Sequence, residues 1–340
     1  MLRKVILLLI AVVSIHTATS QNGQQLFWAL NKCTYYLPNM PYEPSFAFSM
    51  RKLYCESQYA LLARSGTTVQ GNVGFDPTGI VSAASKVKIT VGGTVGGTTL
   101  AVGQEVPYTT FAGGNTVYVV TWYDQGPNKY HAAQTTAANQ PELALLSAGA
   151  GSNTKSSIKF IKANSYFLKV DVELTNLFTN GYIGSLFLST KTTENSSIAT
   201  FGVRVPIPNT TGNWRWSSHI NWSDSALYFD AEKCCVAGSN RKFDNSLNRN
   251  KWKEYTFIRN NETSSNKIVR VSGTEKLNVN EAIVAPPAGA KGFGIGSYLD
   301  NGTAQPFSGY ISELILFPDN LSSSPYLTHT ENFMIDYWGL

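Results

Sequence analysis

The chain has 340 residues, a formal net charge of +5 and a charged fraction of only 14%. Its Lys and Arg residues are spread without runs, whereas nucleic-acid binding requires them clustered on one face, so the composition excludes this class of partner. With 28 glycines and 12% aromatic residues, the composition is typical of an all-β protein built from short strands and turns.

The first 20 residues are predicted to be a secretory signal peptide. Two basic residues precede an apolar run over residues 5–15, and Ala18 and Ser20 place small side chains before the expected cleavage site at Gln21. The run is too short for a transmembrane helix, which needs about 20 apolar residues, and no later stretch reaches that length. We therefore expect a secreted protein, either extracellular or held at the cell surface by a protein partner.

The mature chain is expected to comprise a lead-in over residues 21–45 and one domain over residues 46–340. Alternation and runs of β-forming residues predict strands in both halves of that domain. The predicted strands cover residues 87–91, 117–123, 182–189, 252–259, 267–271, 292–296 and 307–317. The glycine pairs at 92–93 and 96–97 predict hairpin turns, and the run at 117–123 predicts a strand buried on both faces. Only residues 326–337 look helical.

Four cysteines remain after cleavage, and we expect them to be paired in an oxidising compartment. Three pairings of Cys33, Cys55, Cys234 and Cys235 are possible. Pairing Cys33 with Cys55 would fix the N-terminal segment. The adjacent Cys234 and Cys235 would then form a vicinal disulfide or stay as two reduced thiols, and the sequence leaves both alternatives open.

The front half of the chain contains three motifs that point to a known family. They are Phe-Ala-Phe-Ser-Met-Arg-Lys-Leu-Tyr at 46–54, Gly-Phe-Asp-Pro-Thr-Gly at 74–79 and Trp-Tyr-Asp-Gln-Gly-Pro-Asn at 122–128, followed by His131, Gln134, Gln140 and Pro141. Together they resemble the front half of arabinofuranosidase B catalytic domains, which form glycoside hydrolase family 54.

The back half is similar to the laminin-G-like branch of the concanavalin A-like lectin/glucanase superfamily. The residues that carry this similarity are Arg215–His219, Trp222–Asp224, Tyr228–Asp230, Trp252 and Phe307–Glu313. The two resemblances imply an all-β fold, a concanavalin A-like jelly-roll sandwich of two antiparallel sheets with a short C-terminal helix. They do not imply an enzyme, because this fold hosts lectins, adhesion modules and hydrolases alike.

The arabinofuranosidase resemblance suggests one catalytic arrangement. That family uses a glutamate nucleophile and an aspartate acid/base beside a vicinal disulfide that lines the sugar pocket. The resemblance places Cys234-Cys235 at the disulfide, Glu281 at the nucleophile and Asp300 at the acid/base. Retaining chemistry needs the two carboxyl groups about 5 Å apart. The family separates them by a much longer stretch than lies between Glu281 and Asp300, and this departure puts the catalytic assignment in doubt.

Candidate sugar-binding side chains are concentrated between residues 214 and 235. Sugars present apolar C–H faces ringed by hydroxyl groups, so a sugar site combines aromatic rings with polar groups at their edges. The predicted carbohydrate-binding residues are Trp214, Trp216, His219, Trp222, Asp224, Asp230, Cys234, Cys235 and Asp124, with Arg215 and Tyr228 in the same cluster. Trp214 and Trp216 share one face of a strand, and their alternative role is core packing. Asp124 has the alternative role of capping a turn, and His219 that of a structural histidine.

No spacing of His, Cys and carboxylate residues suggests zinc, and no other cofactor is expected. The laminin-G-like resemblance offers a structural calcium ion as an option. Its candidate ligands are Asp224, Asp230 and Asp300, although no loop has a recognisable calcium-binding spacing. Glu313 lies in an alternating strand and is expected either to point to solvent or to be held by a neighbour.

The sequence favours a secreted carbohydrate-binding or adhesive protein without turnover, whose partner is a polysaccharide or another glycan. One alternative is a glycoside hydrolase acting on arabinose-containing polysaccharides, and another is a structural or surface-assembly subunit that binds protein. Two carboxylates facing each other across a pocket near Cys234 and Cys235 would favour the hydrolase. A large exposed apolar patch would favour the assembly subunit.

Overall fold

The computed structural model describes residues 37, 40–145, 156–206, 213–233, 241–298 and 305–340. The predicted signal peptide and most of the lead-in therefore lie outside the described residues. The end of the lead-in belongs to the fold, because Leu37 and Met40 are buried in the same apolar core as the strands. The domain boundary at residue 46 stays a prediction.

Short strands dominate the chain, as the composition predicts. In order, the elements are β1 (Phe46–Ser49), β2 (Tyr59–Ser65), β3 (Val69–Gly74), β4 (Lys86–Val91), β5 (Gly93–Val95), β6 (Thr98–Leu100), β7 (Glu105–Pro107), α2 (Tyr108–Ala112), β8 (Val117–Trp122), β9 (Ala132–Ala133), η2 (Ala137–Asn139), β10 (Glu142–Ala144), β11 (Ser157–Phe160), η3 (Lys162–Asn164), β12 (Leu168–Glu173), α3 (Leu174–Leu177), β13 (Gly184–Thr192), β14 (Phe201–Pro206), β15 (Asn213–His219), β16 (Ala226–Lys233), β17 (Lys242–Asp244), η5 (Ser246–Asn248), β18 (Lys253–Arg259), β19 (Lys267–Val271), β20 (Thr274–Val279), β21 (Lys291–Ile295), β22 (Gly309–Phe317) and α4 (Pro325–Trp338). None of the helices formed by the described residues has the length and apolar character needed to cross a membrane.

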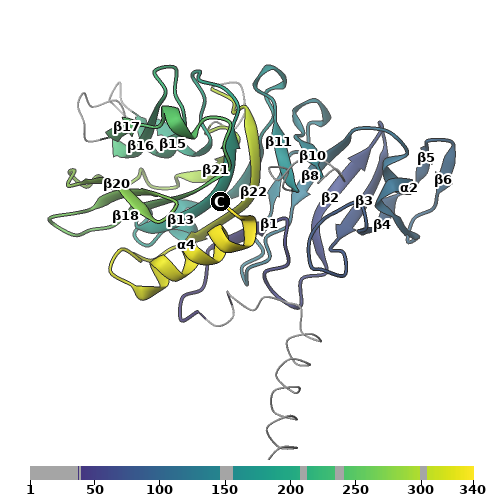
Figure 1. Ribbon diagram of the computed structural model, residues 1–340, viewed down its shortest axis with the longest axis horizontal. Coiled ribbons are helices and arrows are strands. Elements are labelled where there is room, and N and C mark those ends of the chain that lie inside the picture. Colours follow the sequence, from purple (N-terminus) through teal and green to yellow (C-terminus); the bar gives the residue numbers. More distant parts are fainter. Residues whose placement is uncertain (1–36, 38–39, 146–155, 207–212, 234–240, 299–304) are drawn as a thin grey trace, which may run out of the picture.

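The strands form two layers in which every described pairing is antiparallel. One layer runs β20–β19–β18–β13–β22, and β1 and β11 share the free edge of β22. The other runs β17–β16–β15–β14–β21–β12–β9. Strand β8 joins β9 to the sheet of β2, β3, β4 and β7, which lies beside the sandwich in Figure 1. The predicted all-β jelly-roll sandwich with a C-terminal helix is thus confirmed.

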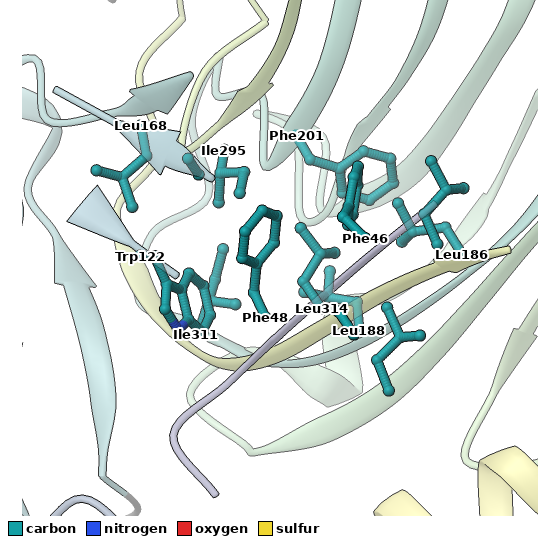
Figure 2. Packing of buried hydrophobic residues seen from close by; sticks show 14 of the residues in the cluster. Phe46, Phe48, Trp122, Leu168, Leu186, Leu188, Phe201, Ile295, Ile311 and Leu314 are labelled. Atoms are coloured by element: carbon teal, nitrogen blue, oxygen red, sulfur yellow. The ribbon is translucent and has the colours of Figure 1, made fainter. Parts of the chain in front are cut away.

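Aromatic side chains from both layers fill the space between them. The ring of Phe257 in β18 lies 5.0 Å from that of Phe201 and 5.3 Å from that of Phe229, which belong to the opposite layer. Figure 2 shows Phe46 and Phe48 of β1 among residues of both layers, and both rings are fully buried. Each such aromatic buries a large apolar area, so this core provides the main driving force for closing the sandwich.

The predicted elements occur where the sequence placed them, with ends that differ by a few residues. Gly96 and Gly97 form the tip of the β5–β6 hairpin with φ of 52° and 79°, which glycine adopts without strain. Gly93 instead begins β5, so the first glycine pair is not a hairpin tip. The prediction that β8 is buried on both faces is wrong, because Tyr118, Val120 and Thr121 are only half-buried. The Tyr118 ring lies under the guanidinium of Arg64, 4.6 Å away, at a partly open surface.

Helix α4 carries the end signals expected of a stable helix. Ser324 accepts a hydrogen bond from the backbone N–H of Tyr326 and Pro325 stands in the first turn, while Gly339 ends the helix with φ of 61°. The helix contacts β13 and β18, so it covers the outer face of their layer. Helix α4 therefore lies on the side of the sandwich away from the outer face of the opposite layer.

A buried ion pair fastens β1, β22 and α4 together. Arg51, just after β1, donates from Nε and Nη2 to the two carboxylate oxygens of Glu313 in β22, at 2.6 and 2.7 Å. Ser49 and the indole of Trp338 donate to the same carboxylate. The guanidinium lies 3.8 Å from the ring centroid of Phe333. Of the two expectations for Glu313, the structure therefore shows that it is held by neighbours, because α4 covers its face of the strand.

Replacing Glu313 with Gln is expected to lower the free energy of unfolding by about 3 kcal/mol, because Arg51 would keep a buried and uncompensated charge. The double variant with Arg51→Met should lose less than the two single losses combined. Denaturant unfolding measures both. Glu105→Gln, which breaks the exposed pair with Lys86, is the control and should cost less than about 1 kcal/mol. A similarly small loss for Glu313→Gln would contradict the assignment.

A second carboxyl, Glu254 of β18, is buried without a full ion pair. Burial and the nearby charge of Glu331 raise the pKa of Glu254 to about 8, against the opposing effects of a Thr256 hydrogen bond and the Arg270 charge. Arg270 is committed to Glu331, with Nε 2.7 Å from the carboxylate. Glu254 is therefore protonated in the folded protein at neutral pH.

This proton makes stability depend on pH. Between the ordinary pKa of 4.5 and the folded value of about 8, the folded state holds a proton that the unfolded chain has released. The free energy of unfolding should thus fall as pH rises through this window, with a slope approaching about 1.4 kcal/mol per unit. Glu254→Gln should flatten the fall, whereas Glu56→Gln, at an exposed position, should not. If the free energy of unfolding falls with pH equally steeply in Glu254→Gln and in the unmodified protein, the raised pKa of Glu254 is refuted.

Candidate functional site

The β15–β16 hairpin sorts its side chains onto two faces. Trp216 contacts Phe229 at 5.1 Å in the core, so the alternate residues of both strands point outward. Register pairs His219 with Tyr228. Two rows of polar and aromatic side chains therefore stand side by side on the outer face of the layer that α4 does not cover, and Arg215 belongs to the first row.

The turn of this hairpin places Trp222 at the end of the outer row. Asn221 adopts φ of 60° at the turn and its side-chain oxygen accepts a hydrogen bond from Asn245. The backbone N–H of Trp222 donates to the carbonyl of Ala226 at 2.8 Å, which closes the turn. The Trp222 ring meets the His219 ring edge-on at 4.7 Å. Trp222 is half-buried and exposes part of its indole.

These side chains line an open pocket with a volume of about 180 Å³. It is smaller than pockets for drug-sized ligands, which span roughly 300–1,000 Å³, and it suits a single small ring. Its lining residues are Arg215, His219, Trp222, Tyr228, Arg241 and Gln305. The pocket thus combines two aromatic rings with hydrogen-bonding groups and guanidinium groups.

Asp230 lies fully buried beneath the pocket and organises its cations. Arg241 donates to both carboxylate oxygens, from Nε at 2.6 Å and from Nη2 at 2.7 Å. Nη1 of Arg215 lies 3.4 Å from the same carboxylate, and Nε2 of His219 lies 3.5 Å from it. The carboxylate therefore draws three basic side chains from β15 and the start of β17 to one point.

The partners of His219 define its hydrogen-bonding role. Nδ1 lies 2.7 Å from the carbonyl oxygen of Ile198, and a carbonyl can only accept, so Nδ1 carries a proton. Nε2 faces the carboxylate of Asp230, which is also an acceptor. Both ring nitrogens thus face acceptors, and these two contacts fix the orientation of the ring.

Cations also hold the two aspartates of the site in the ionised form. Burial raises the pKa of Asp230, but the His219 hydrogen bond and the charges of His219, Arg241 and Arg215 outweigh it, so the net pKa lies below its ordinary value. Burial likewise raises the pKa of Asp224, but hydrogen bonds from Tyr228, Lys242 and the backbone of Ala226 together outweigh it, so the net pKa lies below its ordinary value. Neither carboxyl is suited to donate a proton at neutral pH.

Asp224 lies next to Tyr228, one of the residues that line the pocket. It accepts hydrogen bonds from the Tyr228 hydroxyl at 2.6 Å and from Nζ of Lys242 at 3.0 Å. The Lys242 ammonium and the Arg241 guanidinium both lie over the Tyr228 ring, at 5.3 and 4.7 Å. Tyr228 is therefore clamped between charged groups and presents a fixed ring to the pocket.

The structure separates the predicted tryptophans into two groups. Trp214 and Trp216 are fully buried in the core, and their indole N–H groups donate to the backbone carbonyls of Val284 and Tyr182. The core-packing alternative therefore describes both residues. Trp222 lines the pocket.

Asp124 lies in a different part of the fold and is almost completely buried. One carboxylate oxygen accepts hydrogen bonds from the backbone N–H groups of Ala47 and Gly126, and the other accepts one from Tyr130. Burial raises the pKa of Asp124 against these three bonds. The geometry is that of the turn-capping alternative.

Of the predicted catalytic pair, Glu281 lies within the described residues. Glu281 forms an ion pair with Lys267, and burial lowers the pKa of this lysine against the pull of the carboxylate. Glu281 does not line the pocket. Asp300 and the Cys234-Cys235 pair lie outside the described residues, so their predicted roles stay predictions.

Of the four cysteines that remain after cleavage, Cys55 lies within the described residues. Cys55 is disulfide-bonded, while Cys33, Cys234 and Cys235 lie outside the described residues, so the pairing stays a prediction. The calcium candidates Asp224 and Asp230 do not fit a metal, because cationic side chains already bind their carboxylates. Within the ranges that the structure describes, no group of three or more His, Cys, Asp or Glu residues could hold an ion.

Sequence reasoning missed Arg241 and Gln305. Arg241 follows Gly238, Ser239 and Asn240 in the sequence and precedes β17, a strand of three residues that is too short to give an alternating pattern. Gln305 reaches the site through the hydroxyl of Tyr298, which donates to its side-chain oxygen at 2.6 Å. Only the pairing of β16 with β17 and the return of the chain after β21 bring these residues together, and neither is visible in a linear pattern.

The fold is shared with carbohydrate-active proteins. No protein-family model and no curated protein matches the sequence. A GH54 α-L-arabinofuranosidase soaked with a cyclic sulfate inhibitor matches 88% of this chain with 10% identity and a TM-score of 0.51. An arabinofuranosidase complexed with arabinofuranosyl-α-1,2-xylobiose matches 88% with 9% identity and a TM-score of 0.53. The chain spans 64% of the length of each of these enzymes.

A shorter match is the CBM40 of Ruminococcus gnavus IT-sialidase bound to α2,3-sialyllactose, with 15% identity and a TM-score of 0.36 over 44% of this chain and 82% of that chain. At these identities the similarity concerns the fold. The chain has the β-sandwich fold of the two arabinofuranosidases.

The two groups of tryptophans predict opposite behaviour on truncation. Trp216→Ala should lower the free energy of unfolding by about 3–5 kcal/mol, because it empties a fully buried site. Trp222→Ala should cost less than about 1 kcal/mol, because its indole is half-buried at a surface pocket. Denaturant unfolding of the two variants compares them directly, and a larger loss for Trp222→Ala would overturn the assignment of faces.

Proposed function

We propose that this protein is a secreted carbohydrate-binding protein. It binds a glycan in the pocket lined by Trp222 and Arg241 and does not hydrolyse it. The observation that carries the proposal is a pocket for a single ring that joins aromatic side chains to fixed polar groups. Secretion rests on the N-terminal sequence, and a role in adhesion would follow from the same site.

The chemistry of the lining suits a sugar. Trp222 offers a ring surface for the apolar C–H face of a pyranose or furanose, and Tyr228 lines the pocket beside it. Gln305, Arg215 and Arg241 offer donors and an acceptor at the edge of those rings for hydroxyl groups. Because Asp230 and Tyr298 already hold the polar groups in place, little side-chain entropy is lost on binding.

The carboxyl groups at the pocket support binding without hydrolysis. Glycoside hydrolysis needs two carboxyl groups across the scissile bond, one of them protonated as a general acid. Among the described residues, the acidic groups at this site are Asp224 and Asp230, and the pKa of each is lowered. Both are also engaged by cations, so neither is available as an acid or a nucleophile.

The two alternatives lack a comparable observation. The arabinofuranosidase alternative has the shared fold, and a fold of this kind supports many functions. For an assembly subunit, the exposed large hydrophobic residues of the described segments are few, and apart from the adjacent Ile283 and Val284 they come from different segments. They are Val91, Val102, Leu247, Ile283, Val284 and Tyr337.

Isothermal calorimetry tests the proposal with arabinan, arabinoxylan and galactan. We expect heat that saturates with at least one glycan, and a loss of affinity of at least tenfold in Trp222→Ala, because the aromatic wall is removed. Leu247→Ala, at an exposed residue of η5 outside the pocket lining, should bind like the unmodified protein.

Two outcomes would overturn the proposal. Sustained heat that scales with protein concentration would mean turnover, and its loss in Glu281→Gln and Asp300→Asn would favour the hydrolase. An absence of heat with every glycan, neutral or acidic, would favour a protein-binding role.

A further inference from the structure

The pocket holds more positive than negative charge among its described residues. Arg215, Arg241 and His219 converge on the single carboxylate of Asp230. A guanidinium does not lose its proton in a protein, so two permanent positive charges and a histidine face one negative charge. A partly enclosed site with this excess attracts an anionic ligand.

The charges next to Tyr228 do not cancel this excess. Lys242 and Asp224 form an ion pair with each other at 3.0 Å, so together they add no net charge. The remaining lining residues, which are Trp222, Tyr228 and Gln305, are neutral. The positive excess therefore stays at the floor of the pocket, next to Asp230.

The guanidinium of Arg241 is held in a defined plane. It donates from Nε and Nη2 to Asp230 and lies 4.7 Å from the centroid of the Tyr228 ring. Nη1 does not bond to Asp230 and is the nitrogen directed away from this contact. The Arg215 guanidinium is similarly placed over Tyr298, at 5.1 Å. Fixed planar guanidinium groups recognise carboxylates in preference to neutral hydroxyl groups.

The aromatic wall selects a ring and not a bare anion. The Trp222 ring meets the His219 ring at 4.7 Å and the Tyr228 ring at 6.2 Å, both edge-on. Two ring contacts thus fix the indole beside the cations. A site for inorganic phosphate or sulfate needs hydrogen-bond donors but no half-exposed indole. A sugar ring has an apolar face next to its polar substituents, so it can contact the indole and the cations at the same time.

We propose that the pocket binds a sugar whose ring carries a carboxylate, with the apolar face of the ring against Trp222 and the carboxylate directed to Arg241 and Arg215. The inference rests on the proposed glycan-binding function and names its class of ligand. Uronic acids and ulosonic acids share this chemistry. A volume of about 180 Å³ admits one such residue, so the ligand is a terminal or side-chain sugar of a glycan.

Calorimetry with matched ligands tests the assignment. D-Galacturonic acid and its methyl ester have the same ring and differ in the charge of one group, and D-galactose lacks the carboxyl group altogether. N-Acetylneuraminic acid provides the ulosonic arm, and galactose 6-sulfate provides an anion of different geometry. We expect one of the two carboxylate sugars to bind at least tenfold more tightly than the methyl ester, about 1.4 kcal/mol.

Variants locate the charge that is responsible. Arg241→Gln should reduce the preference for acid over ester to less than about twofold, and raising the salt concentration should weaken the acid more than the ester. Arg241→Lys keeps the charge without the planar fork and should retain only part of the preference. Arg249→Gln changes the net charge equally at an exposed position and should leave the preference intact. Thermal unfolding confirms that each variant is folded.

The outcomes separate this inference from the function on which it rests. If neither carboxylate sugar binds more tightly than the methyl ester, the carboxylate assignment is overturned and a pocket for neutral sugars remains. Tighter binding of galactose 6-sulfate than of either carboxylate sugar would also overturn it. If no sugar of the set binds and the neutral polysaccharides fail as well, the glycan-binding function itself is overturned. The ester comparison on the unmodified protein decides the matter even if Arg241→Gln does not fold.

Discussion

The buried ion pair between Arg51 and Glu313 is the contact on which the rest of the sandwich depends. Taking two charges out of water is costly, and the cost is offset only when geometry and further hydrogen bonds are good. Here the pair is bidentate, Trp338 adds a third donor, and the rings of Phe333 and Tyr337 lie 3.8 and 4.1 Å from the guanidinium. The contact anchors β1 in one layer and α4 on the outer face of that layer. Because α4 is held there, it does not cover the outer face of the opposite layer, where the pocket lies.

The Trp-Tyr-Asp-Gln motif serves the same anchoring. Gln125 accepts a hydrogen bond from the N–H of Leu53 and donates to the carbonyls of Ser49 and Arg51, so it encloses the segment that carries Arg51. Asp124 binds the N–H of Ala47 within β1. The residues that most resemble a hydrolase family thus hold the first strand in place. Their presence is explained by the fold, and it adds no weight to a catalytic role.

The sequence predicted the class of fold and most strands because hydrophobic alternation is a local signal. It did not decide which face of the β15 strand is buried, since Trp214 and Trp216 alternate as regularly as Arg215 and His219. That choice is made by the opposite layer, through contacts such as the one between Phe229 and Phe257. Arg241 was out of reach for a similar reason, because only the pairing of β17 with β16 brings it to Asp230.

The carboxyl groups at the pocket and the carboxyl groups with a raised pKa are different residues. Four described carboxyls have a raised pKa: Glu254, Glu232 and Asp124 are buried and Asp319 is half-buried. Burial raises the pKa of Glu232 while Arg259, 2.6 Å away, opposes it, and none of the four carboxyls lines the pocket. The carboxyls that do lie at the pocket are held ionised by cations. A hydrolase needs the opposite arrangement, with the perturbed acid facing the ligand. The carboxyls of raised pKa thus lie in the scaffold, while the described carboxyls at the pocket are paired with cations, and the proposal of binding without turnover rests on this arrangement.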